Sequence, residues 1–75
     1  RDSILVVDRS IEPKNRDIVI AIFEGNLTVK RLIFKTNGLV VLKSENTSYK
    51  DIKIPESADL EIWGVVTSVI HQFIK

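Results

Sequence analysis

Residues 18–42 read IVIAIFEGNLTVKRLIFKTNGLVVL, three apolar and largely β-branched runs separated by two groups of turn-forming residues. Runs of this kind bounded by Gly and Asn predict β-strands joined by hairpins. The first turn, Glu24-Gly25-Asn26, contains a Gly and an Asn that tolerate positive φ. The second, Asn37-Gly38, is a strong hairpin signal because a type I′ turn needs positive φ at both central residues. We therefore predict a three-stranded antiparallel meander.

The same alternation of apolar clusters and polar connections continues toward both ends of the chain. Pro13 lies in the polar connection 11–16 and cannot donate a ladder hydrogen bond, so the first strand must end before it. The last apolar segment also fits an amphipathic helix, but its Val, Ile and Thr residues favour a strand, and Gly64 favours a bulge that bends it. Six strands are predicted: Ile4 to Val7, Ile18 to Phe23, Leu27 to Phe34, Leu39 to Leu42, Ile52 to Ile54, and Leu60 to about Phe73.

Composition limits the classes of function. The 75 residues, 44% hydrophobic and 28% charged, allow one small globular domain or part of one. A formal net charge of +1 with interspersed acids and bases argues against direct nucleic-acid binding. The absence of Cys and the single His predict no disulfide, no metal site and no cofactor. The apolar runs are shorter than the ~20 residues of a membrane helix, so we expect a cytoplasmic protein without membrane contact.

Lys30 is the candidate catalytic residue. Strand alternation places it on one face with Thr28, Leu32 and Phe34. Removing an ammonium group from water disfavours its charged form, and a neutral lysine can act as the general base that activates a serine hydroxyl. The alternative is an ordinary strand lysine whose amine reaches solvent, and alternation alone favours that interpretation.

The other chemically active side chains have structural explanations. Ser3 begins a strand and is expected to be a solvated hydroxyl, while the loop serines suit turns or caps. His71 has no recognisable orienting carboxylate, so we expect a structural or interfacial role. Trp63 is predicted to lie in the core. Alternation places Lys30 and Arg31 on opposite faces, and no phosphate-binding groove is predicted.

Four segments stand in order along the chain: DSILVVD (2–8), DIVIA (17–21), GNLTVKRL (25–32) and WGVV (63–66). Together they resemble the C-terminal domain of UmuD within the LexA/UmuD family of self-cleaving serine peptidases. The resemblance runs from Asp2 to the C-terminus, and it implies an all-β fold, a strongly bent antiparallel sheet or partly open barrel in which residues 1–75 form part of a single catalytic domain. It also implies that Lys30 is the general base of a Ser-Lys dyad.

The nucleophile of this family lies in an upstream Ser-Gly-x-Ser-Met segment that these 75 residues lack, so the chain alone is expected to be inactive. The resemblance further implies a role in SOS mutagenesis. A RecA filament would stimulate self-cleavage, and the shortened protein would dimerise and join a UmuC-type translesion polymerase. Three alternatives stay open: a LexA or phage repressor domain, a signal-peptidase relative, and a non-enzymatic small β-barrel interaction module.

Two positions depart from the family pattern. Arg16 stands where these proteins commonly have Gly before the Asp-Ile-Val strand, which puts the tight entry turn in question but not the strand. The loop Ser44-Glu45-Asn46-Thr47-Ser48-Tyr49 lacks a Pro that the family often has, so we expect its conformation to differ.

The terminal strand predicts a homodimer. Simple alternation places Val65, Val69 and Phe73 on one face and Val66, Ile70 and Ile74 on the other, which leaves an apolar row and an unpaired edge exposed in a monomer. A second copy would cover both, and the family resemblance implies the same contact. The expected interface residues are Val66, Ser68, Val69, Ile70, Gln72 and Phe73.

Overall fold

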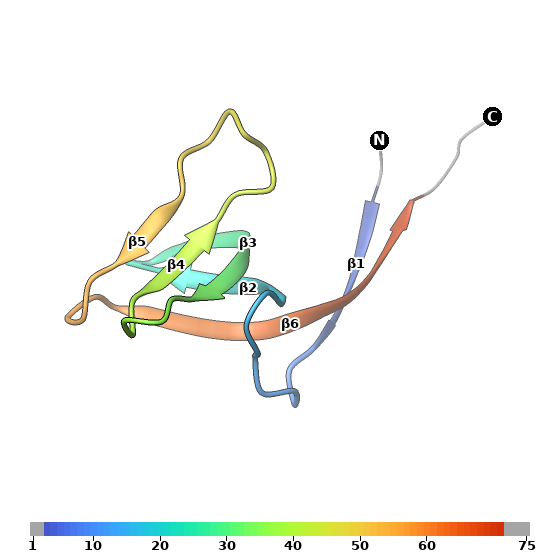
Figure 1. Ribbon diagram of the computed structural model, residues 1–75. Helices are drawn as coiled ribbons and strands as arrows, with labels where there is room; N and C mark the ends of the chain where they lie inside the picture. Colours follow the sequence, from blue (N-terminus) through green and yellow to red (C-terminus); the bar gives the residue numbers. More distant parts are fainter. Residues whose placement is uncertain (1–2, 72–75) are drawn as a thin grey trace.

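The chain forms one six-stranded antiparallel sheet in a computed structural model that describes residues 3–71 (Figure 1). The order across the sheet is β1-β6-β2-β3-β4-β5. All six predicted strands are confirmed, and residues 3–71 contain no helix that could cross a membrane. The strands are β1 (Ser3–Asp8), β2 (Ile18–Phe23), β3 (Asn26–Phe34), β4 (Val40–Lys43), β5 (Ile52–Ile54) and β6 (Leu60–His71).

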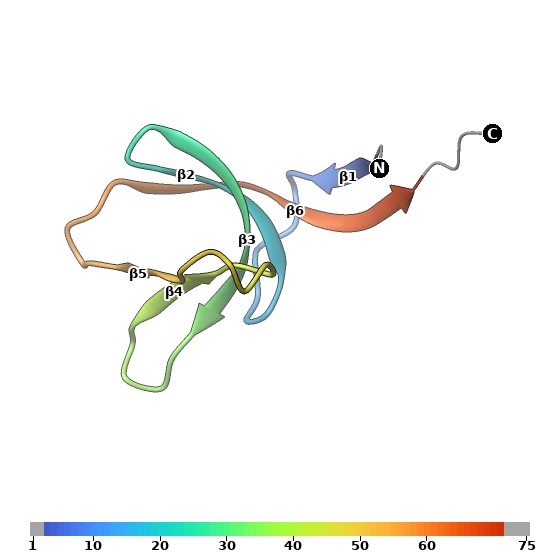
Figure 2. The same cartoon turned by 90° about the horizontal axis from the view of Figure 1, so that it is seen from above.

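The strands β2 to β5 and the first half of β6 curl into a half-open body (Figure 2). Hydrogen bonds pair β5 with β4, and β6 with β1 and β2, so the sheet bends without closing into a barrel. The predicted bent, partly open sheet is therefore confirmed. The core on its inner face comprises Val19, Ala21, Leu32, Leu42, Ile54 and Val65.

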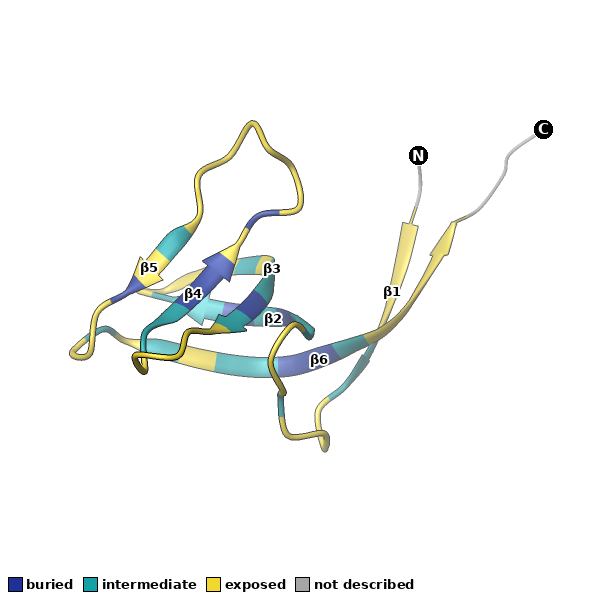
Figure 3. Cartoon of the chain, viewed as in Figure 1, coloured by how far each residue is buried: buried dark blue, intermediate teal, exposed yellow. Residues whose placement is uncertain are grey.

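The long strand β6 belongs to two parts of the molecule. Its first half pairs with β2, and its second half pairs with β1 to form a two-stranded arm that projects from the body (Figure 1). Val65 pairs on both sides, with Val19 and with Asp8. Most of the arm is exposed, whereas the buried residues lie in the body and at this junction (Figure 3).

Two bulges bend β6. The register with β2 skips Trp63, and the register with β1 skips Thr67. Gly64 lies between them, where an added Cβ would come 2.5 Å from Val7 Cγ1, so the close approach of β1 requires a glycine. The bulge at Thr67 shifts the alternation between Val65 and Val69, and the prediction that these two share a face is wrong.

Both hairpin turns form at the predicted places but with different conformations. In the β2–β3 turn the positive φ angles belong to Glu24 (50°) and Gly25 (84°), and Asn26 already pairs in β3. In the β3–β4 turn only Gly38 has positive φ, and its amide donates to the Lys35 carbonyl at 3.0 Å. The type I′ prediction for Asn37-Gly38 is wrong, because the loop has three residues and closes with Gly38 alone in the left-handed region.

The tight turn before β2 forms although Arg16 replaces glycine. Asp17 N donates to the Lys14 carbonyl at 3.0 Å, and Arg16 at the third turn position has a φ of 77°. The amide of Arg16 also donates to the Leu32 carbonyl at 2.7 Å, which ties the turn to β3. These hydrogen bonds hold an arginine in a conformation that glycine adopts with less strain.

Candidate functional site

Lys30 lies on the core-facing side of β3. It pairs across the sheet with Val19 of β2, which is fully buried, and it shares a face with Leu32, which is 2% exposed. Because Val65 and Asp8 continue the same cross-strand row, Lys30 stands at the end of a row that crosses four strands. The lysine side chain is half-buried and starts from an apolar surface.

The amine of Lys30 faces an aromatic ring. Its Nζ lies 5.8 Å from the centroid of the Tyr49 ring, within the range of a cation–π contact. Beside them is an open hollow of about 380 Å³, and no acidic residue lines it. A ligand or polypeptide segment in this hollow would therefore meet an amine without an adjacent carboxylate. The lining residues are Phe23, Asn26, Leu27, Thr28, Lys30, Tyr49, Lys50 and Ile52.

Tyr49 was not among the predicted site residues. Its loop is held by local hydrogen bonds: the buried Ser44 donates from Oγ to the Asn46 carbonyl at 3.0 Å, and Tyr49 N donates to the same carbonyl at 3.0 Å. Ser44 N also donates to Asp51 Oδ1 at 3.2 Å. An aromatic residue in an otherwise polar loop was the available signal, but strand periodicity says nothing about how such a loop folds back.

Arg31 points to the outer face, opposite to Lys30, as alternation predicts. Its Nε and Nη2 donate to the two carboxylate oxygens of Glu45 at 2.9 and 3.1 Å, and its Nη1 donates to the Arg16 carbonyl at 2.7 Å. The hydrogen bonds from Arg31 lower the pKa of Glu45, and those to Glu45 raise the pKa of Arg31. Arg31 thus stabilises the turn before β2 and the loop after β4.

Comparison with known proteins identifies the family. The model of the Peptidase S24-like family matches residues 1–67. The chain belongs to the Peptidase S24-like family. The predicted resemblance to LexA and UmuD-like proteins is thereby confirmed.

Three relatives of this S24-like chain indicate its position in the family. It is 41% identical to Protein ImpA of Salmonella typhimurium over 69 residues, which cover 92% of the chain and 46% of that protein. It is 36% identical to Protein MucA of Escherichia coli over 72 residues (96% and 47%), and 40% identical to the LexA repressor of Magnetococcus marinus over 65 residues (87% and 28%). The chain spans about half of the first two relatives and less of the third.

Ser3 and His71 of this S24-like chain meet across the arm. Ser3 Oγ lies 3.0 Å from His71 Nδ1, and the two residues are cross-strand partners in β1 and β6. Both are exposed, as predicted for Ser3. The pair lies at the tip of the arm, whereas Lys30 lies on β3 in the body (Figure 1). The structure therefore does not bring Ser3 to Lys30.

Trp63 does not belong to the core cluster, so that prediction is wrong. It is half-buried, with the Arg9 guanidinium 4.2 Å from its ring centroid, and Arg9 Nε donates to the Trp63 carbonyl at 2.9 Å. Trp63 is the extra residue of the first bulge and has no partner in β2. The alternation that places Ile62 and Val65 toward the core therefore does not include it.

The expected interface residues lie on the arm as far as the structure describes them. Val66 is half-buried, and Ser68, Val69 and Ile70 are exposed. Gln72 and Phe73 lie outside the described residues. The facing strand β1 adds three exposed apolar residues, Ile4, Leu5 and Val6, so the arm presents more apolar surface than the terminal strand alone predicts.

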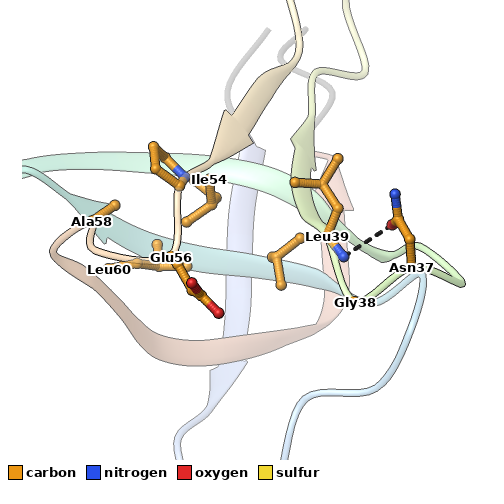
Figure 4. A pocket seen from close by; sticks show the side chains of 9 residues that line it. Asn37, Gly38, Leu39, Ile54, Glu56, Ala58 and Leu60 are labelled. Carbon is orange, nitrogen blue, oxygen red and sulfur yellow. Dashed lines mark hydrogen bonds between the residues drawn. The ribbon is translucent and has the colours of Figure 1, made fainter.

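Another hollow lies elsewhere in residues 3–71. It measures about 560 Å³ and lies between the turn that precedes β4 and the connection from β5 to β6 (Figure 4). Its walls are largely apolar, with Leu39, Ile54, Ala58 and Leu60, and Glu56 is its one titratable side chain. It marks where the half-open body fails to close, and Lys30 does not line it.

Proposed function

We propose that this chain is the C-terminal part of a UmuD-like self-cleaving serine peptidase in which Lys30 is the general base. Membership of the Peptidase S24-like family supports the reaction class. The observation that carries the proposal is the position of Lys30: it extends from a surface made by Val19 and Leu32, and its amine borders an open hollow without an acidic lining residue.

The nucleophile is proposed to come from polypeptide that precedes Ser3 in the longer protein. Three serine hydroxyls have other described partners: Ser3 contacts His71, Ser10 donates to Asp8, and Ser44 donates to Asn46. Residues 1–75 alone are therefore proposed to be inactive.

In the proposed reaction the neutral amine of Lys30 accepts the proton of the serine hydroxyl. The serine Oγ forms a bond to the carbonyl carbon of the scissile peptide, the C–N bond breaks, and Lys30 returns the proton to the leaving amine. Water then hydrolyses the acyl-enzyme ester with Lys30 again as base.

Substitution of Lys30 in the longer protein tests this proposal. Lys30→Ala should reduce self-cleavage by at least about a hundredfold, the usual contribution of a positioned general base. The measurement is the rate of fragment appearance on a denaturing gel, at alkaline pH and with a RecA filament. Lys14→Ala, an exposed lysine in the connection before β2, is the matched control and should cleave normally. Persistent cleavage by Lys30→Ala would remove Lys30 from the mechanism.

The cellular role is proposed from the UmuD-like resemblance. The protein would act in the cytoplasm in SOS mutagenesis, respond to a RecA filament, form a homodimer through the arm, and assist a UmuC-type translesion polymerase. Co-purification with such a polymerase, before and after cleavage, tests the partner directly, and the absence of a complex in both forms would contradict this role.

A repressor domain is the second candidate, favoured by the 40% identity to the LexA repressor of Magnetococcus marinus. It would use the same fold and the same lysine in a protein with a DNA-binding N-terminal domain. A helix-turn-helix segment upstream, together with operator binding that is lost on cleavage, would decide for it. A non-enzymatic interaction module would be favoured if the longer protein never cleaves itself.

A further inference from the structure

The outer face of the sheet, opposite to Lys30, carries two adjoining hollows. They measure about 470 and 410 Å³ and share Lys35, Val41 and Asp51, so they lie side by side over β3, β4 and β5. We call this feature the outer groove. Besides the three shared residues, the first hollow is lined by Arg16, Arg31, Ile33, Lys43 and Glu45, and the second by Thr36, Asn37, Leu39 and Lys53.

Apolar side chains form the floor of the outer groove. Ile33 and Val41 are cross-strand partners on β3 and β4, and Lys53 of β5 pairs with Val41 on its other side. Val41 is only 6% exposed although it lies outside the core cluster. Basic side chains line the two hollows around it, and long basic side chains commonly cover apolar surface with their stems while their charged ends reach water.

The rim of the outer groove concentrates positive charge. Five of the eleven basic residues of the chain line it, with two of the ten acidic residues, which leaves six basic and eight acidic residues for the rest of the molecule. Both acids are already engaged, Glu45 with Arg31 at 2.9 Å and Asp51 with Lys43 at 3.9 Å. Within residues 3–71, Arg16, Lys35 and Lys53 take part in no ion pair.

Like charges also face one another here, since Arg31 is the cross-strand partner of Lys43. Such a pair weakens a sheet. The concentration of basic side chains is therefore not explained by the stability of the strands, and it is consistent with an external anionic group.

The composition of the groove favours an acidic polypeptide over a nucleic acid. No aromatic side chain lines either hollow, whereas single-stranded nucleic acids are usually bound on aromatic platforms. Glu45 and Asp51 would repel a continuous row of phosphates. An extended peptide, by contrast, can place carboxylates on the rim and an apolar side chain on the floor, and β5 beside it is an edge strand.

We propose that the outer groove docks an extended acidic segment of a partner protein. Lys35 and Lys53 contact its carboxylates, and Ile33 and Val41 contact an apolar side chain between them. The docking face is the reverse of the face that carries Lys30, so partner binding and self-cleavage use separate surfaces of one thin sheet.

Fluorescence anisotropy tests the proposal with a labelled peptide in which Glu residues flank one Leu. The protein should bind this peptide at low ionic strength and release it as salt screens the charges. Lys35→Glu, at the junction of the two hollows, should weaken binding about tenfold, since the charge reversal removes an attractive pair and adds a repulsive one. Lys50→Glu makes the same change of charge on the opposite face and should leave the affinity within about twofold, and so should Lys30→Ala.

Thermal melting checks that each variant is folded. If Lys35→Glu does not fold, Lys53→Glu on the edge strand gives the same test. The proposal is overturned if the protein does not bind the peptide, or if Lys50→Glu weakens binding as much as Lys35→Glu. It is also overturned if a labelled oligothymidylate binds with the Lys35 dependence expected of the peptide, because the groove would then be a nucleic-acid site.

Discussion

Arg16 keeps a backbone conformation that its side chain disfavours. Its φ of 77° lies in the left-handed region, where a Cβ costs about 1–2 kcal/mol, and the hydrogen bond from Arg16 N to Leu32 O fixes it there. Arg16→Gly should therefore stabilise the protein, by about 0.5–1 kcal/mol after the larger entropy of the unfolded glycine chain is subtracted.

Thermal or denaturant unfolding of the purified protein measures this effect. Lys14→Gly is the matched control, because Lys14 in the same turn has no positive φ and its replacement should be neutral or destabilising. A lower melting temperature for Arg16→Gly would show that the arginine side chain contributes more than its backbone strain costs.

Glu45 gives the stability a defined pH dependence. Hydrogen bonds from Arg31 lower its pKa below the ordinary value, so the folded state favours the ionised carboxylate. Its contribution is complete above the ordinary pKa of a glutamate and is lost as the pH falls through the lowered value. Glu45→Gln should reduce stability at neutral pH and have little effect in strong acid. The difference in melting temperature between the two proteins should therefore shrink as the pH is lowered. A difference that stays constant across the acidic range would contradict the assigned cause.

At the scale of one element, β6 depends on Gly64. A Cβ at this position would lie 2.5 Å from Val7 Cγ1 and 3.4 Å from Arg9 Cγ, so the Val7 side chain would have to move or β1 and β6 would have to separate. Gly64→Ala should destabilise the protein by about 1–3 kcal/mol, the usual cost of overpacking. The double variant Gly64→Ala/Val7→Ala removes the clashing methyl group and should recover part of the loss. Equal melting temperatures for the single variant and the unsubstituted protein would exclude the steric explanation.

The strands could be predicted because the apolar clusters have the length and side-chain type of strands and are separated by turn residues. The conformation of the turns could not. Glu24 rather than Asn26 takes positive φ, since the pairing of Phe23 with Asn26 leaves Glu24 and Gly25 as the two turn residues. That register depends on both strands, and the composition of the turn does not determine it.

The bulges of β6 escaped prediction for a related reason. Trp63 is a bulge residue because of how β6 pairs with β2, and Thr67 because of how β6 pairs with β1. Both partner strands lie far away in the sequence. Simple alternation therefore failed at Trp63 and again at Thr67, and the core position expected for Trp63 was wrong because of the first of these bulges. In the candidate site, the face of Lys30 could be predicted from local alternation. Its contact with Tyr49 could not, because it depends on the conformation of the loop between β4 and β5.

The arm carries apolar side chains on which no other part of residues 3–71 packs. Ile4 and Ile70 are cross-strand partners that are 45% and 47% exposed, and Leu5 and Val69 form a similar pair. These pairs expose apolar side chains that a second copy would bury. We expect a dimer at micromolar concentration in sedimentation equilibrium.

Ile70→Asp should shift this equilibrium to the monomer. Val29→Asp replaces an exposed apolar residue of β3 in the body and should leave the dimer intact, so it serves as the matched control. A monomeric unsubstituted protein, or equal effects of both substitutions, would exclude the arm as the interface.

The double pairing of Val65 has a mechanical consequence. Within residues 3–71, the body and the arm are joined by β6 and by the connection 9–17, and the core cluster ends at Val65. A small change of twist beside Gly64 would therefore change the direction of the arm, while the core cluster lies on the other side of this point. Two copies held at their arms could in this way adopt different angles between their bodies without unfolding either one.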